Sequence, residues 1–133
     1  MAKYAVANGA YIWAKHVTGP GWENATGVAV DSAGDIAVAG NFSISIDFGG
    51  GAVTGRTSTG AENAFVAKLS GASGAQVWAR GFTATGNDSG TAVAIDGNRN
   101  VVTAGWFGGT GNFGAATLTS TGSSDIFVVD LTP

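Results

Sequence analysis

The chain has no cysteine, two prolines, one histidine and few charged residues. Without cysteine it can form neither a disulfide nor a cysteine-based metal site, and one histidine cannot make the usual zinc sites. Charged residues are 11 % of the sequence, against roughly 25 % in an ordinary globular domain. The net charge of −3 argues against nucleic-acid binding, which needs a basic surface. No run of about 18 apolar residues could span a membrane, and the N-terminus lacks the pattern of a signal peptide.

Glycine and apolar residues are abundant instead. There are 23 glycines in 133 residues, about 17 % against an average near 7 %. Hydrophobic residues reach 44 %, which argues against disorder, and the glycines have no period of three, which excludes collagen. Tight turns and sheet faces buried on both sides would require this composition.

An internal repeat organises the sequence. Trp-Ala-Lys at residues 13–15 recurs as Trp-Ala-Arg at 78–80, a shift of 78 − 13 = 65 residues. The same shift maps Val-Ala-Val-Asp at 28–31 onto Val-Ala-Ile-Asp at 93–96. After a three-residue gap near residues 55–57, the segment 65–69 matches 127–131 with a shift of 62. Identities in fixed order at this spacing indicate a repeat protein.

Each repeat is predicted to be all-β. Alternating apolar residues bounded by Gly, Asp and Asn clusters indicate short strands joined by hairpin turns, and glycine interrupts every window long enough for a helix. The predicted strands are 27–30, 35–42, 64–69 and 75–82 in the first copy, and 91–95, 100–107 and 126–131 in the second. Four short antiparallel strands in a unit of about 65 residues match a β-propeller blade.

The motifs also resemble a known family, the bacterial β-propeller repeat of the SBBP type. The matching segments are Trp-Ala-Lys at 13–15, the Gly-Val-Ala-Val-Asp motif at 27–31, Val-Ala-Gly-Asn-Phe at 38–42, Asp-Phe-Gly-Gly-Gly at 47–51 and Phe-Val-Ala-Lys-Leu at 65–69. The second copy departs from the pattern at residues 96–100 and at Asn112. The resemblance covers nearly the whole chain and implies a propeller fold of the kind found in large secreted or surface proteins. It implies no catalytic residue and no cofactor.

Two blades cannot close a propeller, which typically has four to eight. The second blade lacks a fourth strand at its C-terminal end, and residues 10–17 supply such a strand at the N-terminus. We therefore expect residues 1–17 to complete the last blade of a neighbouring copy, residues 18–82 to form blade 1 and residues 83–133 to form blade 2. Head-to-tail association would give a homotrimer with six blades, the preferred state, or a homotetramer with eight. Residues 1–5 are expected to be frayed or displaced in that ring.

The chain begins and ends inside a repeat, so we expect a two-blade fragment of a longer array or an engineered protein. A small natural ring-forming protein is the alternative. Aromatic residues at equivalent positions are predicted to form the core between blades. These are Trp13, Trp78, Phe42, Phe107, Phe48, Phe113, Phe65 and Phe127.

Two further tryptophans are not required by the repeat, because Trp22 and Trp106 correspond to Asn87 and Asn41 in the other copy. An exposed Trp beside short polar groups is typical of a sugar-binding site. Trp22, Glu23, Asn24 and Trp106 are therefore candidate glycan-binding residues, with packing between blades as the alternative for Trp106.

No catalytic or metal site is predicted. Asp31 and Asp96 recur before turns, but the two copies have too few carboxylates for a calcium loop, so each side chain is expected to bond its own turn amides. His16 corresponds to Gly81, and no Gly-x-Ser-x-Gly motif accompanies it. The sequence thus favours a non-enzymatic propeller module that assembles with itself, without cofactor, metal, nucleic acid or membrane. The alternative is a lectin-like propeller that binds glycans.

Overall fold

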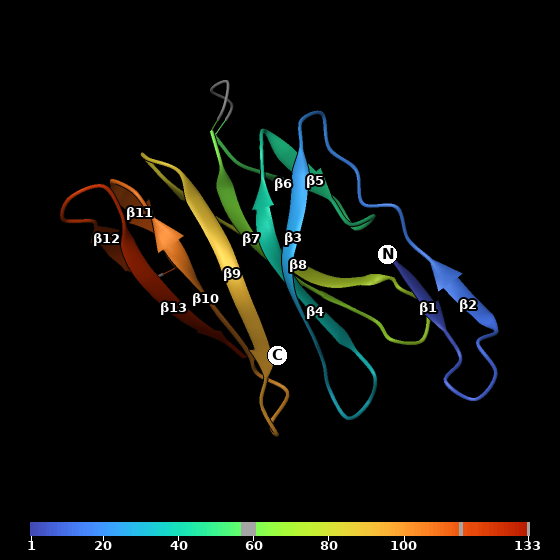
Figure 1. Ribbon diagram of the computed structural model, residues 1–133. Helices are drawn as coiled ribbons and strands as arrows, with labels where there is room; N and C mark the ends of the chain where they lie inside the picture. The colour runs from blue at the N-terminus through green and yellow to red at the C-terminus, as the bar shows by residue number, and fades with distance from the viewer. Residues whose placement is uncertain (57–60, 115, 133) are drawn as a thin grey trace.

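The computed structural model describes residues 1–56, 61–114 and 116–132, and all regular secondary structure in this part is β (Figure 1). The all-β expectation is therefore confirmed. The strands are β1 (Ala2–Tyr4), β2 (Tyr11–Ala14), β3 (Glu23–Val30), β4 (Ile36–Phe42), β5 (Ser45–Asp47), β6 (Ala52–Thr54), β7 (Asn63–Leu69), β8 (Gln76–Ala84), β9 (Asp88–Ile95), β10 (Val101–Phe107), β11 (Thr110–Asn112), β12 (Thr117–Thr119) and β13 (Asp125–Leu131).

The central element is an antiparallel meander of β3, β4, β7 and β8, which we call the first sheet. Val38 lies opposite Val28 on one side and Ala67 on the other. Residues directly opposite one another share a face of the sheet. Because successive side chains of each strand point to opposite faces, the apolar residues of these strands cover both faces of the sheet. The hairpin of β11 and β12 continues the hydrogen-bonded order from the end of β8.

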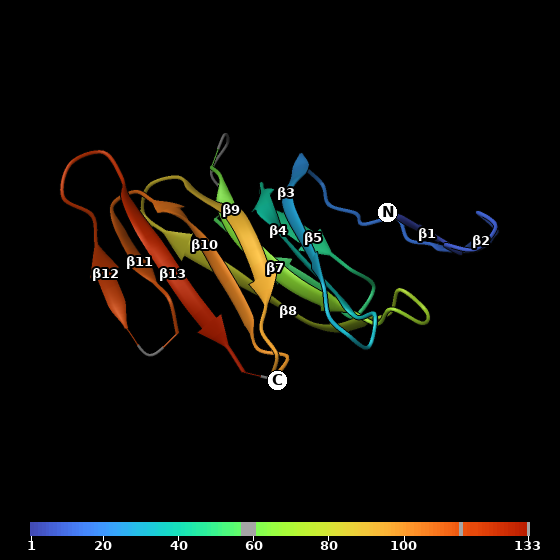
Figure 2. The same ribbon diagram turned by 60° about the horizontal axis from the view of Figure 1, so that its bottom comes forward.

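The second sheet contains β9, β10 and β13 and lies beside the first, as both views show (Figure 2). Trp106 lies opposite Ser89 on β9 and Ile126 on β13. Within the described part of the chain, β13 pairs with β10 alone, so its outer edge has no strand beside it. None of the described sheets closes on itself.

The inner strand of each sheet begins earlier than predicted, at Glu23 rather than residue 27 and at Asp88 rather than residue 91. A β-bulge between Ala25 and Gly27 hides the continuity, because it breaks the two-residue alternation. The other long strands lie within two residues of their predicted ends.

Two short hairpins occupy connections in which the sequence predicted no strand. β5 pairs with β6, and β11 pairs with β12. In both, the side chain that ends the first strand caps the turn: Asp47 accepts from the amide of Gly49 at 2.6 Å, and Asn112 accepts from that of Gly114 at 2.9 Å. Strands of three residues are too short for their alternation to be recognised, which explains the omission.

The N-terminal strand is shorter than expected. Residues 10–17 were predicted as one strand, but β2 covers four residues and pairs with β1. The expected displacement of residues 1–5 concerns the assembled ring and stays a prediction. The ammonium group of Met1 donates to the carbonyl of Lys15 at 3.0 Å, and the Lys15 amide donates back at 2.8 Å. In the single chain these bonds hold the terminus in place. The hairpin lies at the opposite end of the molecule from β12 and β13 (Figure 1).

Two hydrophobic cores flank the first sheet. The inter-sheet core fills the space between the two sheets, and the outer core lies on the other face, under β5 and β6. The fully packed members of the inter-sheet core are Ala37, Ala64, Val66, Phe82, Ala84, Val101, Phe107 and Phe127. Those of the outer core are Val38, Phe42, Ile46, Phe48, Phe65, Ala67 and Leu69.

Candidate functional site

The two sheets contact each other through small side chains on one and aromatic side chains on the other. Small residues of the first sheet, including Ala37, Ala64 and Val66, face Phe107 and Phe127 of the second. All five are buried. Small side chains on one face and aromatic rings on the other let the two sheets approach closely.

Glycine sets the closest approach of the two backbones. A Cβ at Gly90 of β9 would lie 3.2 Å from the carbonyl oxygen of Gly40 on β4 and 3.3 Å from that of Phe65. Thr26, the bulged residue of β3, donates its hydroxyl to the carbonyl of Gly90. The contact between sheets therefore contains direct backbone contacts and a hydrogen bond as well as apolar packing.

An ion-pair cluster joins the two sheets at one end of these strands, and we call it the latch. Arg99 of the β9–β10 turn contacts Asp31 at 3.1 Å and Asp35 at 2.8 Å, and Lys68 lies 3.3 Å from Asp31. Burial alone would raise the pKa of Asp31, but the hydrogen bonds from Arg99, the Asp35 amide and Lys68 lower it to about 2. The same carboxylate also raises the pKa of Arg99. The pair of Asp31 and Arg99 is therefore ionised at all ordinary pH values.

The sequence did not predict the latch, although a signal was present. Arg99 occupies the position that Gly34 holds in the first copy, since 34 + 65 = 99. Its φ is 69°, in the left-handed region that disfavours residues with a Cβ. An arginine at a turn position where the other copy has glycine indicates that its side chain makes a specific contact.

The other face of the first sheet is partly open. Val28 and Val30 are 68 % and 62 % exposed, whereas their counterparts Val93 and Ile95 pack against the inter-sheet core. A groove of about 530 Å³ runs along this face, and its lining includes Met1, Ala2, Val28, Val30, Ile36 and Val38. This surface, here called the front face, presents apolar side chains that the second copy of the repeat buries.

The far face of the second sheet is open as well. Ile126 and Val128 are 79 % and 68 % exposed, whereas the residues 62 positions earlier, Ala64 and Val66, are fully buried. Trp106 shares this face because it lies opposite Ile126. We call this surface the rear face. It corresponds, by repeat position, to the buried face of the first sheet.

The eight aromatic residues singled out in the sequence take three different places. Phe107, Phe113, Phe127 and Trp78 belong to or pack against the inter-sheet core, and Phe42, Phe48 and Phe65 belong to the outer core. Trp13 is buried apart from both, where its indole N–H donates to the Gly71 carbonyl at 3.1 Å.

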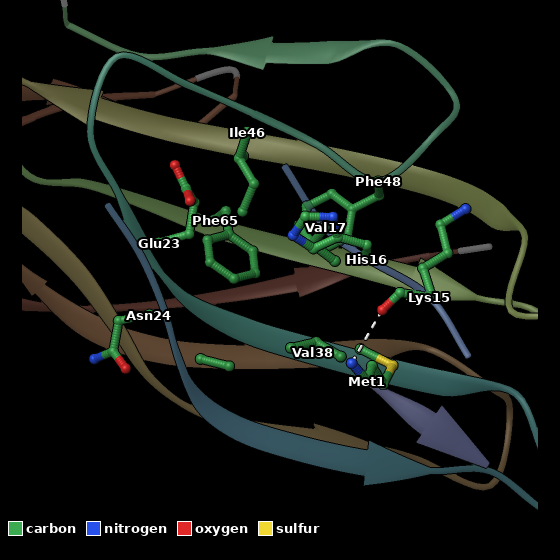
Figure 3. Close-up of a pocket in the computed structure, with 11 residues that line it drawn as sticks. Met1, Lys15, His16, Val17, Glu23, Asn24, Val38, Ile46, Phe48 and Phe65 are labelled. Atoms are coloured by element: carbon green, nitrogen blue, oxygen red, sulfur yellow. Dashed lines mark hydrogen bonds between the residues drawn. The ribbon is translucent and has the colours of Figure 1, made fainter. Parts of the chain in front are cut away.

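Glu23 and Asn24 line a pocket of about 280 Å³ together with Lys15 and His16. Figure 3 shows Glu23 and Asn24 at one side of this pocket, Lys15 and His16 at the other, and the ring of Phe65 between them. One oxygen of Glu23, Oε1, is buried without a hydrogen-bond partner among the described residues. The pocket thus combines polar groups at its sides with an apolar floor.

Trp22 and Trp106 do not share one cleft. Trp22 precedes β3 and is 43 % exposed, but it is absent from the lining of the pocket that contains Glu23 and Asn24. Trp106 is half-buried on the rear face of the second sheet. The four candidate glycan-binding residues therefore occupy two separate surfaces.

The recurring aspartates cap their own turns, as the sequence predicted. Asp31 accepts from the amides of Ala33 and Asp35 at 2.9 Å, and Asp96 accepts from those of Asn98 and Asn100 at 2.8 Å. Over residues 1–56, 61–114 and 116–132, no three His, Cys, Asp or Glu side chains gather as metal ligands. The same residues include no helix that is both long and apolar enough to cross a membrane.

No known protein-family model matches the chain, and no curated protein sequence matches it. The resemblance to SBBP-type repeats accordingly stays a prediction from the motifs.

Proposed function

We propose that the chain is a non-enzymatic β-propeller module that assembles with identical copies, head to tail, into a closed ring. One observation carries the proposal. The front and rear faces, both open in the single chain, occupy the repeat positions of the two faces that meet in the inter-sheet core. A second copy is therefore the partner whose shape fits each face.

The side-chain sizes on the two open faces support this pairing. On the rear face, Ile126 and Val102 stand where Ala64 and Ala37 stand in the inter-sheet core, and are larger. On the front face, Val30 and Ala67 stand where Ile95 and Val129 stand, and are smaller. At these positions the smaller residues on one face offset part of the extra volume on the other, and cores tolerate exchanges that approach the original volume.

The packing of the N-terminal segment supports the proposal. Val17 corresponds to Phe82, since 17 + 65 = 82, and it packs against the outer core as Phe82 packs in the inter-sheet core. In the proposed ring, the strand that contains β2 completes the second sheet of the neighbouring copy along the free edge of β13. Three copies would give six blades, and four would give eight.

The molecular mass in solution tests the proposal. Light scattering over a concentration series should give about 39 kDa for a trimer of the 13.1 kDa chain, or about 52 kDa for a tetramer. Ile126→Glu should remain a monomer, because assembly would bury an unpaired carboxylate. Val6→Glu, at a fully exposed turn position, is the matched control and should assemble. A wild-type chain that stays near 13 kDa at every concentration would refute self-assembly.

Glycan binding is a second candidate function, favoured by the polar groups of Glu23 and Asn24 in one pocket and by the exposure of Trp22, which precedes Glu23 in the chain. An aromatic ring next to short polar groups suits the apolar and hydroxylated sides of a pyranose. A glycan array tests it: binding that is lost in Trp22→Ala but kept in Trp106→Ala supports a site at this pocket. No binding at high protein concentration would remove this candidate.

A further inference from the structure

The pairing of β1 with β2 copies a pairing found in the middle of the chain. Ala2, Lys3 and Tyr4 lie opposite Ala14, Trp13 and Tyr11. Adding 65 to each number gives the observed pairs of β7 with β8, from Ala67 opposite Ala79 to Leu69 opposite Gln76. The register irregularity also recurs at the same step, between Lys3 and Tyr4 and between Lys68 and Leu69. β1 therefore stands in the place of the third strand of a sheet.

In the proposed ring, β13 of a second copy is expected at the same position. β13 is the counterpart of β7 with a shift of 62, so residues 129–131 correspond to residues 67–69 and hence to residues 2–4. In a ring closed by strand exchange, Asp130 of one copy would lie opposite Trp13 of the next, where Lys3 lies now. Both strands cannot occupy the edge of β2 at once.

We propose that β1 is a placeholder that covers the assembly edge of β2 and is displaced by β13 of a second copy. The inference rests on the proposed ring and adds a competition step to it. The three residues of β1 pair with β2 in the free chain, and the longer β13 replaces them in the assembled one.

Three features of the structure favour displacement. β1 has three residues, none of them buried, whereas β13 has seven and includes buried Phe127. By the register of β7 and β8, β13 would extend the pairing to Val17 opposite Ile126. Lys15 would also lie diagonally from Asp130 on the same face, an attractive neighbour that Lys3 does not provide.

Removing the placeholder should strengthen assembly. A chain lacking residues 1–7 should reach half-assembly at a concentration at least about tenfold lower than the full chain. A competing interaction of roughly 1.4 kcal/mol, once removed, changes the association constant by that factor. Sedimentation equilibrium on both proteins gives the two midpoints. The result that overturns the inference is an equal or higher midpoint for the shortened chain while both proteins assemble.

Fixing the placeholder should have the opposite effect. Met1 and Lys15 exchange both backbone hydrogen bonds, so Ala2 and Ala14 form the next, non-hydrogen-bonded pair, with Cα atoms about 4.5 Å apart. That separation suits a disulfide, and the chain has no other cysteine. Ala2→Cys with Ala14→Cys, oxidised in dilute solution, should stay a monomer and assemble again after reduction. Each single cysteine variant, kept reduced, is the control.

The outcomes separate the two proposals. If the full chain and the shortened chain both stay near 13 kDa, self-assembly itself fails, and the placeholder with it. If the full chain assembles and the oxidised variant assembles equally well, the ring proposal stands and the placeholder is wrong. Assembly of the reduced but not the oxidised variant supports both.

Discussion

Asp88 should make the stability of this protein depend on pH in a direction opposite to most acidic groups. Its side chain is fully buried at the start of β9, where Oδ2 accepts from the Ala84 amide at 2.7 Å. The other oxygen, Oδ1, has no hydrogen-bond partner among the described residues. Burial raises the pKa of Asp88 from 3.8 to about 6, against the lowering effect of the Ala84 bond and Arg56.

The sign follows from proton linkage. Between pH 3.8 and about 6 the folded chain holds a proton on Asp88 that the unfolded chain has lost, so stability falls as pH rises through this window. The stabilisation is fully present below pH 3.8 and absent above about 6. A difference of about 2 in pKa corresponds to ~3 kcal/mol in the free energy of unfolding, at 1.36 kcal/mol per unit.

Asp88→Asn isolates this contribution, because the amide keeps an acceptor for Ala84 and cannot ionise. Urea unfolding of both proteins from pH 3.5 to 7.5 should show the variant gaining ~3 kcal/mol relative to the wild type as pH rises. All other titrating groups cancel in the difference. Curves that stay parallel across the window would refute a raised pKa at this position.

Three further predictions concern the latch and the glycines. Arg99→Ala should raise the pKa of Asp31 from about 2 towards 3.8, measured by NMR titration of its carboxyl carbon, because it removes the nearest cation; an unchanged midpoint would contradict the latch. Arg99→Gly should be more stable than Arg99→Ala by ~1 kcal/mol, because φ is 69° there, and equal melting temperatures would argue against strain. Gly40→Ala should lower the free energy of unfolding by more than about 2 kcal/mol, because its Cβ would overlap the carbonyl oxygen of Asn24. Gly97→Ala has open space around the new Cβ and should leave the stability nearly unchanged. Similar melting temperatures for the two variants would count against the close packing at Gly40.

The long strands could be predicted from the sequence because each carries an alternating pattern between clear turn signals. Val38 and Val28 on one face, with Ala37 and Ala29 on the other, indicate from the residue pattern alone that β3 and β4 are partners. The apolar content of both faces also indicated sheets covered on two sides. The starts of β3 and β9 were missed because the bulge at Thr26 and its counterpart shifts the alternation by one residue.

The surfaces were harder to predict than the strands. The sequence identified Phe107 and Phe127 as packing residues, but periodicity cannot say which of two equivalent faces is covered within one chain. Ile126 is exposed and Ala64 is buried because only the first sheet has a neighbour on that face. The latch depends on a turn residue reaching across to another sheet, a contact 68 positions apart in sequence between Arg99 and Asp31, and no local pattern encodes such a distance.

The latch also has a consequence for the symmetry of the proposed ring. Between the two sheets of one chain, Arg99 holds Asp31 and Asp35. At the seam between copies, the position of Arg99 is taken by Gly34, which has no side chain to offer, and Asp130 stands where Lys68 stands. In the proposed trimer, contacts that contain the latch would therefore alternate with contacts that lack it, so the six-bladed ring would have threefold rather than sixfold symmetry. Heat or denaturant would release two-bladed units first, with their internal seam intact.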